Sequence, residues 1–328
     1  MPVMRAVRVT RLDGPAAVSV EEIDEPGPEG PFGPQLLVEV HAVGISFPDL
    51  LLSKGEYQLK PEPPFTLGVD FAGVVRSAPE GSGFSAGDRV AACLGNGGAS
   101  DVVGLGPDSV FPLPDELSFE QGAAIPMNYL TAHFALVERG GLAEGETVLV
   151  HGAAGGVGTA TIQVAKGYGA RTIAVVSTDE KAEVARRAGA DEAVLVDGFR
   201  DAVKELTEGR GVDVVVDVVG GGLMTDSLRS LATQGRLLVV GFTGGSIPEV
   251  KVNRLLLNNI DVRGVGWGAY AMVRPGYMRQ QWDALVPLMR SGVIDPPIGA
   301  TYPMEEFGRA LQDMEERRTL GKSVVTLR

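Results

Sequence analysis

The residues best suited to chemistry lie in a glycine-rich stretch over 152–158, Gly-Ala-Ala-Gly-Gly-Val-Gly. An apolar, β-branched run over 147–150 precedes it, and apolar residues at helical spacing follow over 159–165. A strand, a glycine turn and a helix in this order can hold a dinucleotide pyrophosphate. Glycine lets the backbone approach the ligand, and the helix N-terminus supplies N–H groups. The predicted contacts lie in the turn: Ala154, Gly155, Gly156 and Val157.

The elements around this turn predict a doubly wound parallel sheet. A second apolar strand over 172–176 completes a strand–helix–strand unit. Further strands are predicted over 193–196, 212–217, 236–241 and 260–265. These runs alternate with segments of helical length, and six strands make up a full dinucleotide-binding sheet of the Rossmann type.

The composition is typical of a globular protein with two domains. Of 328 residues, 44% are hydrophobic and 22% charged, which disfavours disorder. A net charge of −13 disfavours binding to nucleic acid, and no stretch approaches the roughly 20 apolar residues of a membrane span. The single cysteine, Cys93, excludes an intramolecular disulfide and suits a reducing compartment. We therefore expect a cytoplasmic protein without nucleic-acid or membrane partners.

The N-terminal third has a different character. Valine-rich segments over 36–43 and 71–75 alternate with Gly and Pro turns, which is typical of a compact antiparallel β domain. The C-terminal tail is predicted to contain two helices and a strand, over 277–290, 304–317 and 323–327. Because this tail is short for a domain of its own, we expect it to pack onto the first one. The expected division is a β domain over 1–120, a dinucleotide domain over 121–267 and a returning tail over 268–328.

This order of parts resembles the medium-chain dehydrogenase/reductase superfamily, and within it the zinc-independent quinone oxidoreductase branch that includes zeta-crystallin. The resemblance covers nearly the whole chain and rests on four segments: 44–51, 67–75, 86–90 and 152–158. It implies an α/β fold with a six-stranded, doubly wound parallel Rossmann domain. An N-terminal antiparallel β domain of the GroES-like type would be completed by the C-terminal tail. The implied activity is transfer of hydride from NADPH to a quinone or an activated α,β-unsaturated carbonyl.

Ligands for zinc are sparse in this sequence. Catalytic zinc needs three His, Cys or carboxylate ligands and structural zinc about four, whereas the chain has three widely spaced histidines and one cysteine. Where zinc members of the superfamily carry a ligand cysteine, this chain has Ser46. Where they carry a histidine before an acidic residue, it has Val69 before Asp70. No metal is therefore expected, and His151 is expected to be packed or hydrogen-bonded.

Without a metal, hydrogen bonds or the cofactor itself must polarise the substrate carbonyl. Tyr57 is the candidate catalytic donor, because a phenol can hydrogen-bond a developing enolate and pass on a proton. In the related enoyl thioester reductases, a tyrosine after a glycine in a matching segment has this role. The alternative is that Tyr57 is a loop residue that only packs against the substrate pocket.

The second strand of the dinucleotide unit bears on the choice of cofactor. Its last residue is Val176, where an NAD-preferring site commonly has an acidic residue. Ser177 can donate to a 2′-phosphate, and Lys181 lies within one helical turn. Family members that bind NADPH use a similar pair, so NADP is expected, with a solvated surface lysine as the alternative for Lys181.

Other cofactor contacts come from the resemblance alone. They are Thr131, Gly241, Phe242, Thr243, Trp267 and Lys322. The segment 241–243 also follows a predicted strand at the sheet edge where ligands bind in open α/β sheets. For Trp267, core packing is the alternative.

Assembly and two competing functions complete the expectations. The predicted strand over 259–265 is apolar for a sheet edge, and an unpaired edge of that kind recruits another chain. In relatives the equivalent strands pair across a two-fold axis, so a homodimer is expected. An enoyl or acryloyl thioester reductase stays open as an alternative, and so does a non-catalytic, zeta-crystallin-like binding protein.

Overall fold

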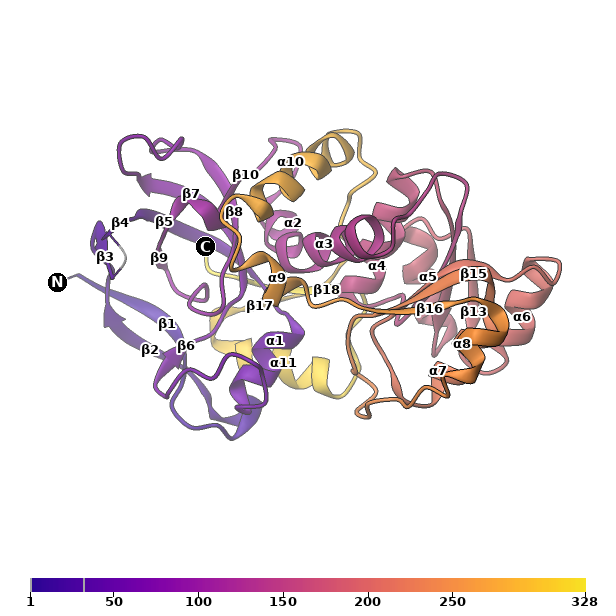
Figure 1. Cartoon of the computed structure of the whole chain (residues 1–328). Coiled ribbons are helices and arrows are strands. Elements are labelled where there is room, and N and C mark those ends of the chain that lie inside the picture. The colour runs from indigo at the N-terminus through magenta and orange to yellow at the C-terminus, as the bar shows by residue number, and fades with distance from the viewer. Residues whose placement is uncertain (1, 32) are drawn as a thin grey trace. The chain divides into compact units, whose positions relative to one another are not determined.

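The computed structural model describes residues 2–31 and 33–328, which form two compact units (Figure 1). Unit 1 comprises Met1–Met127, Pro275–Arg290 and Ile298–Arg328, and unit 2 comprises Asn128–Arg274 and Ser291–Pro297. The C-terminal part of the chain therefore returns to unit 1. The domain limits expected at residues 120 and 267 stay predictions.

The described residues of unit 2 form a parallel sheet of six strands in the order β13-β12-β11-β14-β15-β16, which confirms the predicted fold class. The strands are β11 (Thr147–His151), β12 (Arg171–Val176), β13 (Glu192–Leu195), β14 (Val212–Asp217), β15 (Leu231–Val239) and β16 (Asp261–Gly264). The strand order changes direction between β11 and β14. In open α/β sheets, ligands bind at the carboxyl edge of that point.

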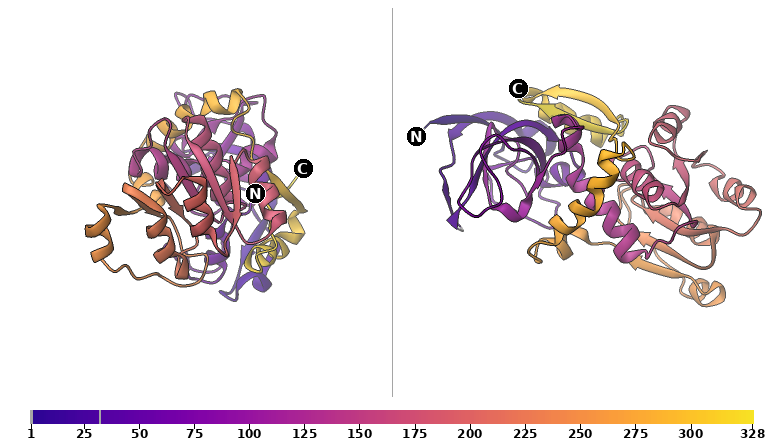
Figure 2. Two further views of the ribbon diagram at one scale, coloured as in Figure 1. Left: turned by 90° about the vertical axis from the view of Figure 1, so that its right-hand side faces the viewer. Right: turned by 90° about the horizontal axis from the view of Figure 1, so that it is seen from above.

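Helices flank this sheet (Figure 2, left). They are α3 (Pro126–His133), η3 (Phe134–Arg139), α4 (Gly156–Gly167), α5 (Asp179–Arg187), α6 (Phe199–Leu206), η4 (Gly221–Leu223), α7 (Met224–Ser230), α8 (Asn253–Asn258) and α9 (Trp267–Ala271). Val214, Val215 and Val216 in β14 are fully buried. Three consecutive buried residues show that this strand is covered on both faces, as its apolar sequence predicts.

Unit 1 is a β structure made of a three-stranded sheet, a seven-stranded sheet and a short hairpin in its described residues. The three-stranded sheet contains β1 (Val3–Val9), β2 (Val18–Asp24) and β6 (Phe65–Thr66). The larger sheet contains β5 (Leu36–Gly44), β7 (Asp70–Ser77), β8 (Arg89–Cys93), β9 (Val102–Leu105), β10 (Val110–Pro112), β17 (Ile298–Pro303) and β18 (Lys322–Thr326). The hairpin contains β3 (Glu29–Gly30) and β4 (Gly33–Pro34).

Helices and 3-10 turns accompany these strands in unit 1. They are η1 (Gly14–Ala17), α1 (Phe47–Ser53), η2 (Pro107–Ser109), α2 (Phe119–Ala124), α10 (Tyr277–Arg290), η5 (Met304–Glu306) and α11 (Phe307–Glu315). The helix predicted over 304–317 is thus a 3-10 turn followed by a shorter α-helix. In the parts of both units that the structure describes, no helix is long and apolar enough to cross a membrane.

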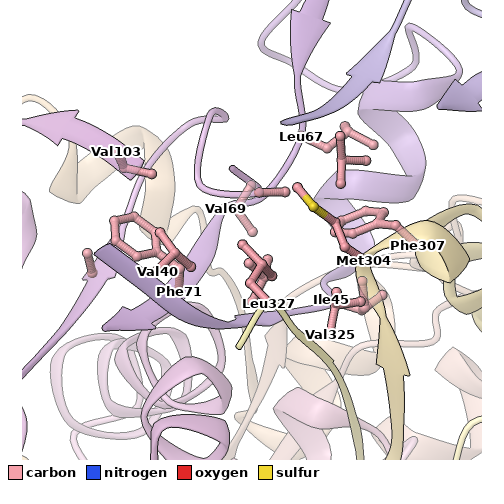
Figure 3. Packing of buried hydrophobic residues seen from close by; sticks show 14 of the residues in the cluster. Val40, Ile45, Leu67, Val69, Phe71, Val103, Met304, Phe307, Val325 and Leu327 are labelled. Carbon is pink, nitrogen blue, oxygen red and sulfur yellow. The ribbon is translucent and has the colours of Figure 1, made fainter. Parts of the chain in front are cut away.

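The C-terminal tail completes the β domain, as predicted. β18 pairs antiparallel with β5, so that Val325 lies opposite Val43, and the yellow C-terminal strands lie beside the indigo ones (Figure 2, right). Side chains from both ends of the chain share one core. Figure 3 shows Met304, Phe307 and Val325 packed near Leu67 and Ile45. Burial of this apolar surface holds the tail on the N-terminal sheets.

Candidate active site

The glycine turn in unit 2 has the geometry of a pyrophosphate cradle. Gly155 is the extended N-cap residue of α4, and Gly158 lies in the first turn of that helix. A Cβ atom on Gly158 would lie 2.2 Å from the carbonyl oxygen of Gly152, so only glycine allows this approach of helix to loop. The first N–H groups of a helix have no partner within it, and the dipole makes this end positive. The predicted contacts Ala154, Gly155, Gly156 and Val157 lie in this turn.

The end of the second strand brings together the predicted 2′-phosphate ligands. β12 ends at Val176, and the exposed Ser177 follows. The Nζ atom of Lys181 donates a 3.3 Å hydrogen bond to the Oγ atom of Ser177. Thr178 caps α5, because its side-chain oxygen accepts from the backbone N–H of Lys181. The cap places the lysine one turn into the helix, next to Ser177.

The segment 241–243 follows β15 at the carboxyl edge of the same sheet. The backbone N–H and Oγ of Thr243 donate to the carbonyl oxygen of Val218, at 3.1 and 3.0 Å. Phe242 is 39% exposed, so its ring is accessible to a ligand. Gly241, Phe242 and Thr243 therefore lie where the sequence expects them, beside the loop that follows β14.

Thr131 and Trp267 are both buried in unit 2. Thr131 lies in α3 and is 8% exposed, and Trp267 begins α9 and is 3% exposed. Little of either side chain is open to a ligand, although both lie in the unit that holds the glycine turn. Their cofactor roles stay predictions.

Lys322 lies in unit 1, in a buried polar cluster. Its Nζ atom donates to the Oγ atom of Ser46 at 2.6 Å and to Oδ2 of Asp70 at 3.0 Å. Ser46 also donates to the same carboxylate oxygen, at 2.8 Å. Lys322 is 4% exposed and Asp70 is fully buried. The carboxylate thus compensates the buried ammonium, and a cofactor contact for Lys322 stays a prediction.

Asp49 supports the same region from α1. Its Oδ1 accepts from the backbone N–H of Gly68 at 2.9 Å, and its Oδ2 accepts from that of Ser46 at 3.1 Å. Burial raises the pKa of this carboxyl to about 7, although both N–H groups favour the charged form. Asp49 therefore fixes the loop before β7 against the start of α1.

Tyr57 lies in the turn after α1, where it is half-buried against the core of unit 1. Burial raises the pKa of the Tyr57 phenol above its ordinary value of 10, and the neighbouring Cys93 and Asp49 side chains add to this shift. The phenol is therefore protonated at neutral pH and able to donate a hydrogen bond. This protonation state is the one that the predicted catalytic role requires.

Each histidine has a packing or hydrogen-bond partner, which for His151 confirms the expectation. His41 packs against Phe119, with ring centroids 4.2 Å apart and a tilt of 36° between the rings, and His133 Nε2 lies 3.0 Å from the Tyr168 hydroxyl. The Nε2 atom of His151 lies 2.8 Å from the Oγ atom of Ser227. Across residues 2–31 and 33–328, no three His, Cys, Asp or Glu side chains are grouped so that they could hold a metal ion.

The sequence alone indicates no role for Asp49 and Asp70. Both lie in the segments that carry the family resemblance, which was the available signal. Their partners could not be read from the sequence, because the Asp70–Lys322 contact spans 252 residues. Nor did the sequence indicate that Asp217 lies near His151.

Two protein-family models match this chain, one mainly in each unit. The Alcohol dehydrogenase GroES-like domain matches residues 33–115 in unit 1. The Zinc-binding dehydrogenase model matches residues 156–291, most of which belong to unit 2.

Relatives cover nearly the whole chain. Quinone oxidoreductase-like protein 2 of Rattus norvegicus is 37% identical over 329 residues, which span 99% of this chain and 92% of that protein. A probable oxidoreductase of Mycobacterium abscessus has a TM-score of 0.90 at 43% identity, with 99% of each chain covered. Escherichia coli quinone oxidoreductase, solved in complex with NADPH, has a TM-score of 0.86 at 29% identity and covers 98% of this chain and 100% of its own. The chain belongs to the quinone oxidoreductase branch of the medium-chain dehydrogenase/reductase superfamily.

Proposed function

We propose that this protein is an NADPH-dependent oxidoreductase that reduces a quinone or an activated α,β-unsaturated carbonyl. The observation that carries the proposal is the pairing of Ser177 with Lys181 beside a strand that ends in Val176, without an acidic residue. An acidic residue there would repel a 2′-phosphate, whereas a lysine attracts it. The complex of Escherichia coli quinone oxidoreductase with NADPH supports the same cofactor.

The residues of unit 2 would bind and orient the cofactor. The turn over 154–157 binds the pyrophosphate, and Ser177 with Lys181 binds the 2′-phosphate. Thr131, Trp267 and the segment 241–243 are the further proposed contacts in this unit, and Lys322 of unit 1 is one more. When bound, NADPH supplies the hydride for the substrate.

Tyr57 is proposed as the catalytic donor to the substrate oxygen. Negative charge builds on that oxygen as an enone or quinone accepts hydride, and a protonated phenol stabilises it by donating a hydrogen bond. The raised pKa of Tyr57 keeps this proton in place at neutral pH. Proton transfer from the phenol to this oxygen then gives a hydroquinone from a quinone, or an enol from an enone. The enol tautomerises to the saturated ketone, and solvent returns a proton to the phenolate.

We propose that the reaction proceeds without zinc. Ser46, which stands where zinc members carry a ligand cysteine, accepts a hydrogen bond from the Lys322 ammonium and donates one to Asp70. A buried ammonium beside this hydroxyl disfavours a second cation there by charge repulsion. Elemental analysis should find far less than one zinc per chain, and stoichiometric zinc would contradict this part of the proposal.

A cytoplasmic homodimer is the proposed assembly. β16 is the last strand in the sheet order, and the nearby α8 and the loop before it expose large apolar side chains. Ile247, Val252, Leu256 and Leu257 are between 73% and 77% exposed. A strand at a sheet edge and exposed apolar side chains both favour association with a second copy. Light scattering should give twice the chain mass of 34.3 kDa, and a monomer at micromolar concentration would contradict the dimer.

An enoyl thioester reductase is the second candidate, because Tyr57 is in the segment where those enzymes have a catalytic tyrosine. Steady-state oxidation of NADPH with quinones, simple enones and enoyl thioesters separates the two candidates. Preference for quinones or free enones supports the first. A thioester with a far higher kcat/KM than any free enone would replace it with the second.

A further inference from the structure

His151 and Asp217 end two neighbouring strands of the parallel sheet in unit 2. Val150 of β11 pairs with Val216 of β14, so the residues that follow them lie next to each other on one face. Both side chains are fully buried. Among the described residues, Nδ1 of His151 and Oδ2 of Asp217 have no hydrogen-bond partner. Buried polar atoms without a partner are rare in folded proteins and destabilising.

The hydrogen bonds around His151 determine which nitrogen of its imidazole ring carries the proton. The hydroxyl of Ser227 donates its single hydrogen to the carbonyl oxygen of Leu223, at 2.8 Å. His151 Nε2, 2.8 Å from the same Oγ atom, must therefore be the donor in that contact. Burial lowers the pKa of His151 to about 4, although the nearby Asp217 carboxylate opposes this shift. The imidazole is therefore neutral at pH 7 and Nδ1 is an acceptor.

Asp217 also presents an acceptor oxygen, on the same face of the sheet as His151. Its Oδ1 accepts from the backbone N–H groups of Val219 and Gly220, at 2.8 and 2.9 Å. Its Oδ2 is the oxygen without a partner. Two buried acceptors cannot satisfy each other, but a single water molecule has two hydrogens and can donate one to each.

The turn that Asp217 holds lies beside both loops proposed to bind the dinucleotide. A Cβ atom on Gly152 would lie 2.8 Å from Cγ2 of Val218, so the glycine turn packs directly on this segment. On the other side, the carbonyl oxygens of Val218 and Val219 accept from the N–H groups of Thr243 and Gly244. A displacement of residues 217–220 would therefore move both loops.

We propose that His151 and Asp217 are positioning residues for the dinucleotide, joined by one buried water molecule that donates to Nδ1 of His151 and to Oδ2 of Asp217. The pair holds the turn over 217–220 and, through it, the loops at Gly152 and Thr243. This inference rests on the proposed NADPH site. In addition to the glycine turn, the pair would stabilise the loops that bind the dinucleotide.

Three substitutions test the positioning role by fluorescence titration with NADPH. Asp217→Ala and His151→Phe each remove one acceptor and should raise the Kd for NADPH about tenfold or more, or about 1.4 kcal/mol. At saturating NADPH, kcat should stay within about twofold, because neither residue touches the substrate. Asp217→Asn keeps the Oδ1 contacts and presents an amide donor toward the water or Nδ1, so it should bind NADPH nearly as well as the unmodified protein.

Thr172→Val is the matched control for these variants. It removes a buried hydroxyl from the opposite end of the sheet, where Thr172 bonds to Asp191 at 3.1 Å. This control should lower the free energy of unfolding and leave the Kd for NADPH unchanged. The positioning role is overturned if Asp217→Asn binds as poorly as Asp217→Ala, or if all three variants bind normally. Failure of the unmodified protein to bind NADPH would instead overturn the proposed function.

A readout without cofactor tests the water bridge itself. Nitrogen-15 NMR of the unmodified protein should show Nδ1 of His151 unprotonated and hydrogen-bonded and Nε2 protonated. A high-resolution crystal structure should show one water between Nδ1 and Oδ2. A proton on Nδ1 at pH 7, or a gap without water, would contradict the bridge even if every variant failed to fold.

Discussion

The Nζ atom of Lys322 lies 3.0 Å from Oδ2 of Asp70, although 252 residues separate the two in the sequence. Lys322 begins the last strand, β18, and Asp70 begins β7. Asp70 is also held by the backbone N–H of Met127, which donates to Oδ1 at 2.8 Å. The ion pair thus connects the C-terminal strand, the N-terminal sheet and the end of the first segment of unit 1.

Removing one partner of this buried ion pair should lower the free energy of unfolding. In Lys322→Met, the buried Asp70 carboxylate loses its cation, which costs about 3–5 kcal/mol in comparable buried pairs. Urea unfolding measures the loss, and the double variant Lys322→Met with Asp70→Asn should recover part of it. Arg328→Ala is the control, because the Arg328–Glu39 pair is exposed and such pairs contribute less than about 1 kcal/mol. Equal losses in Lys322→Met and Arg328→Ala would contradict the structural importance of the buried pair.

Lys181→Ala should weaken binding of NADPH selectively. The 2′-phosphate loses a charge-assisted partner, so the Kd for NADPH should rise about tenfold, whereas that for NADH should change less than twofold. Lys204→Ala, on the surface of α6, is the control for a general loss of positive charge. Isothermal titration of both cofactors measures the effect. Equal weakening of NADPH and NADH would show that Lys181 does not contact the phosphate.

Tyr57→Phe tests the proposed catalytic donor. In the proposed mechanism the phenol stabilises a charge that develops in the transition state. Single-turnover reduction of an enone should therefore slow about tenfold to a hundredfold, with cofactor affinity unchanged. A quinone should be affected less, because its conjugated ring accepts hydride more readily. Tyr302→Phe removes a phenol that bonds Asp313 at 2.7 Å and is the matched control. If Tyr57→Phe keeps full single-turnover rates, Tyr57 is not the catalytic donor and only packs against the pocket.

The buried imidazole of His151 predicts a specific dependence of stability on pH. Burial lowers its pKa from 6.5 to about 4, so the unfolded chain takes up a proton at this residue more readily than the folded protein. The stability associated with neutral His151 is complete above pH 6.5 and is lost as pH falls toward 4. Between pH 7.5 and 5 this should remove on the order of 2 kcal/mol.

His151→Phe separates this effect from the titration of carboxylates. Urea unfolding of the unmodified protein and of the variant should be measured at both pH values. The unmodified protein should lose more stability than the variant over this interval, by on the order of 2 kcal/mol. Parallel losses would show that His151 does not titrate in this way.

Elements with a strong local pattern could be predicted from the sequence. The helix over 277–290 begins and ends as predicted, and the order of six strands alternating with helices follows from the apolar runs. The strand predicted over 236–241 is instead Leu231–Val239. Its register against β14 is irregular, because Val212 pairs with Leu231 and Val214 with Arg236. Gln234 has a φ of 65°, which no local residue preference indicates.

The candidate site was predictable only where its residues are neighbours in sequence. The glycine turn and the Ser177–Lys181 pair follow from spacing along one strand–helix junction. The sequence does not indicate that Ser46 and Asp70 are the partners of Lys322, because these contacts depend on how the tail packs on the β domain. His151 and Asp217 become neighbours only because β11 pairs with β14 and not with the next strand in sequence.

The most direct test of the central claim is transfer of hydride from NADPH to an organic acceptor. Purified protein should be mixed with NADPH deuterated at the transferable position of the nicotinamide and with a small cyclic enone, and the product analysed by mass spectrometry. We expect one deuterium on the β-carbon of the saturated ketone, and a rate with NADPH at least about tenfold higher than with NADH. A protein that binds NADPH but transfers no deuterium to any enone, and oxidises no NADPH with any quinone, would contradict the assigned activity.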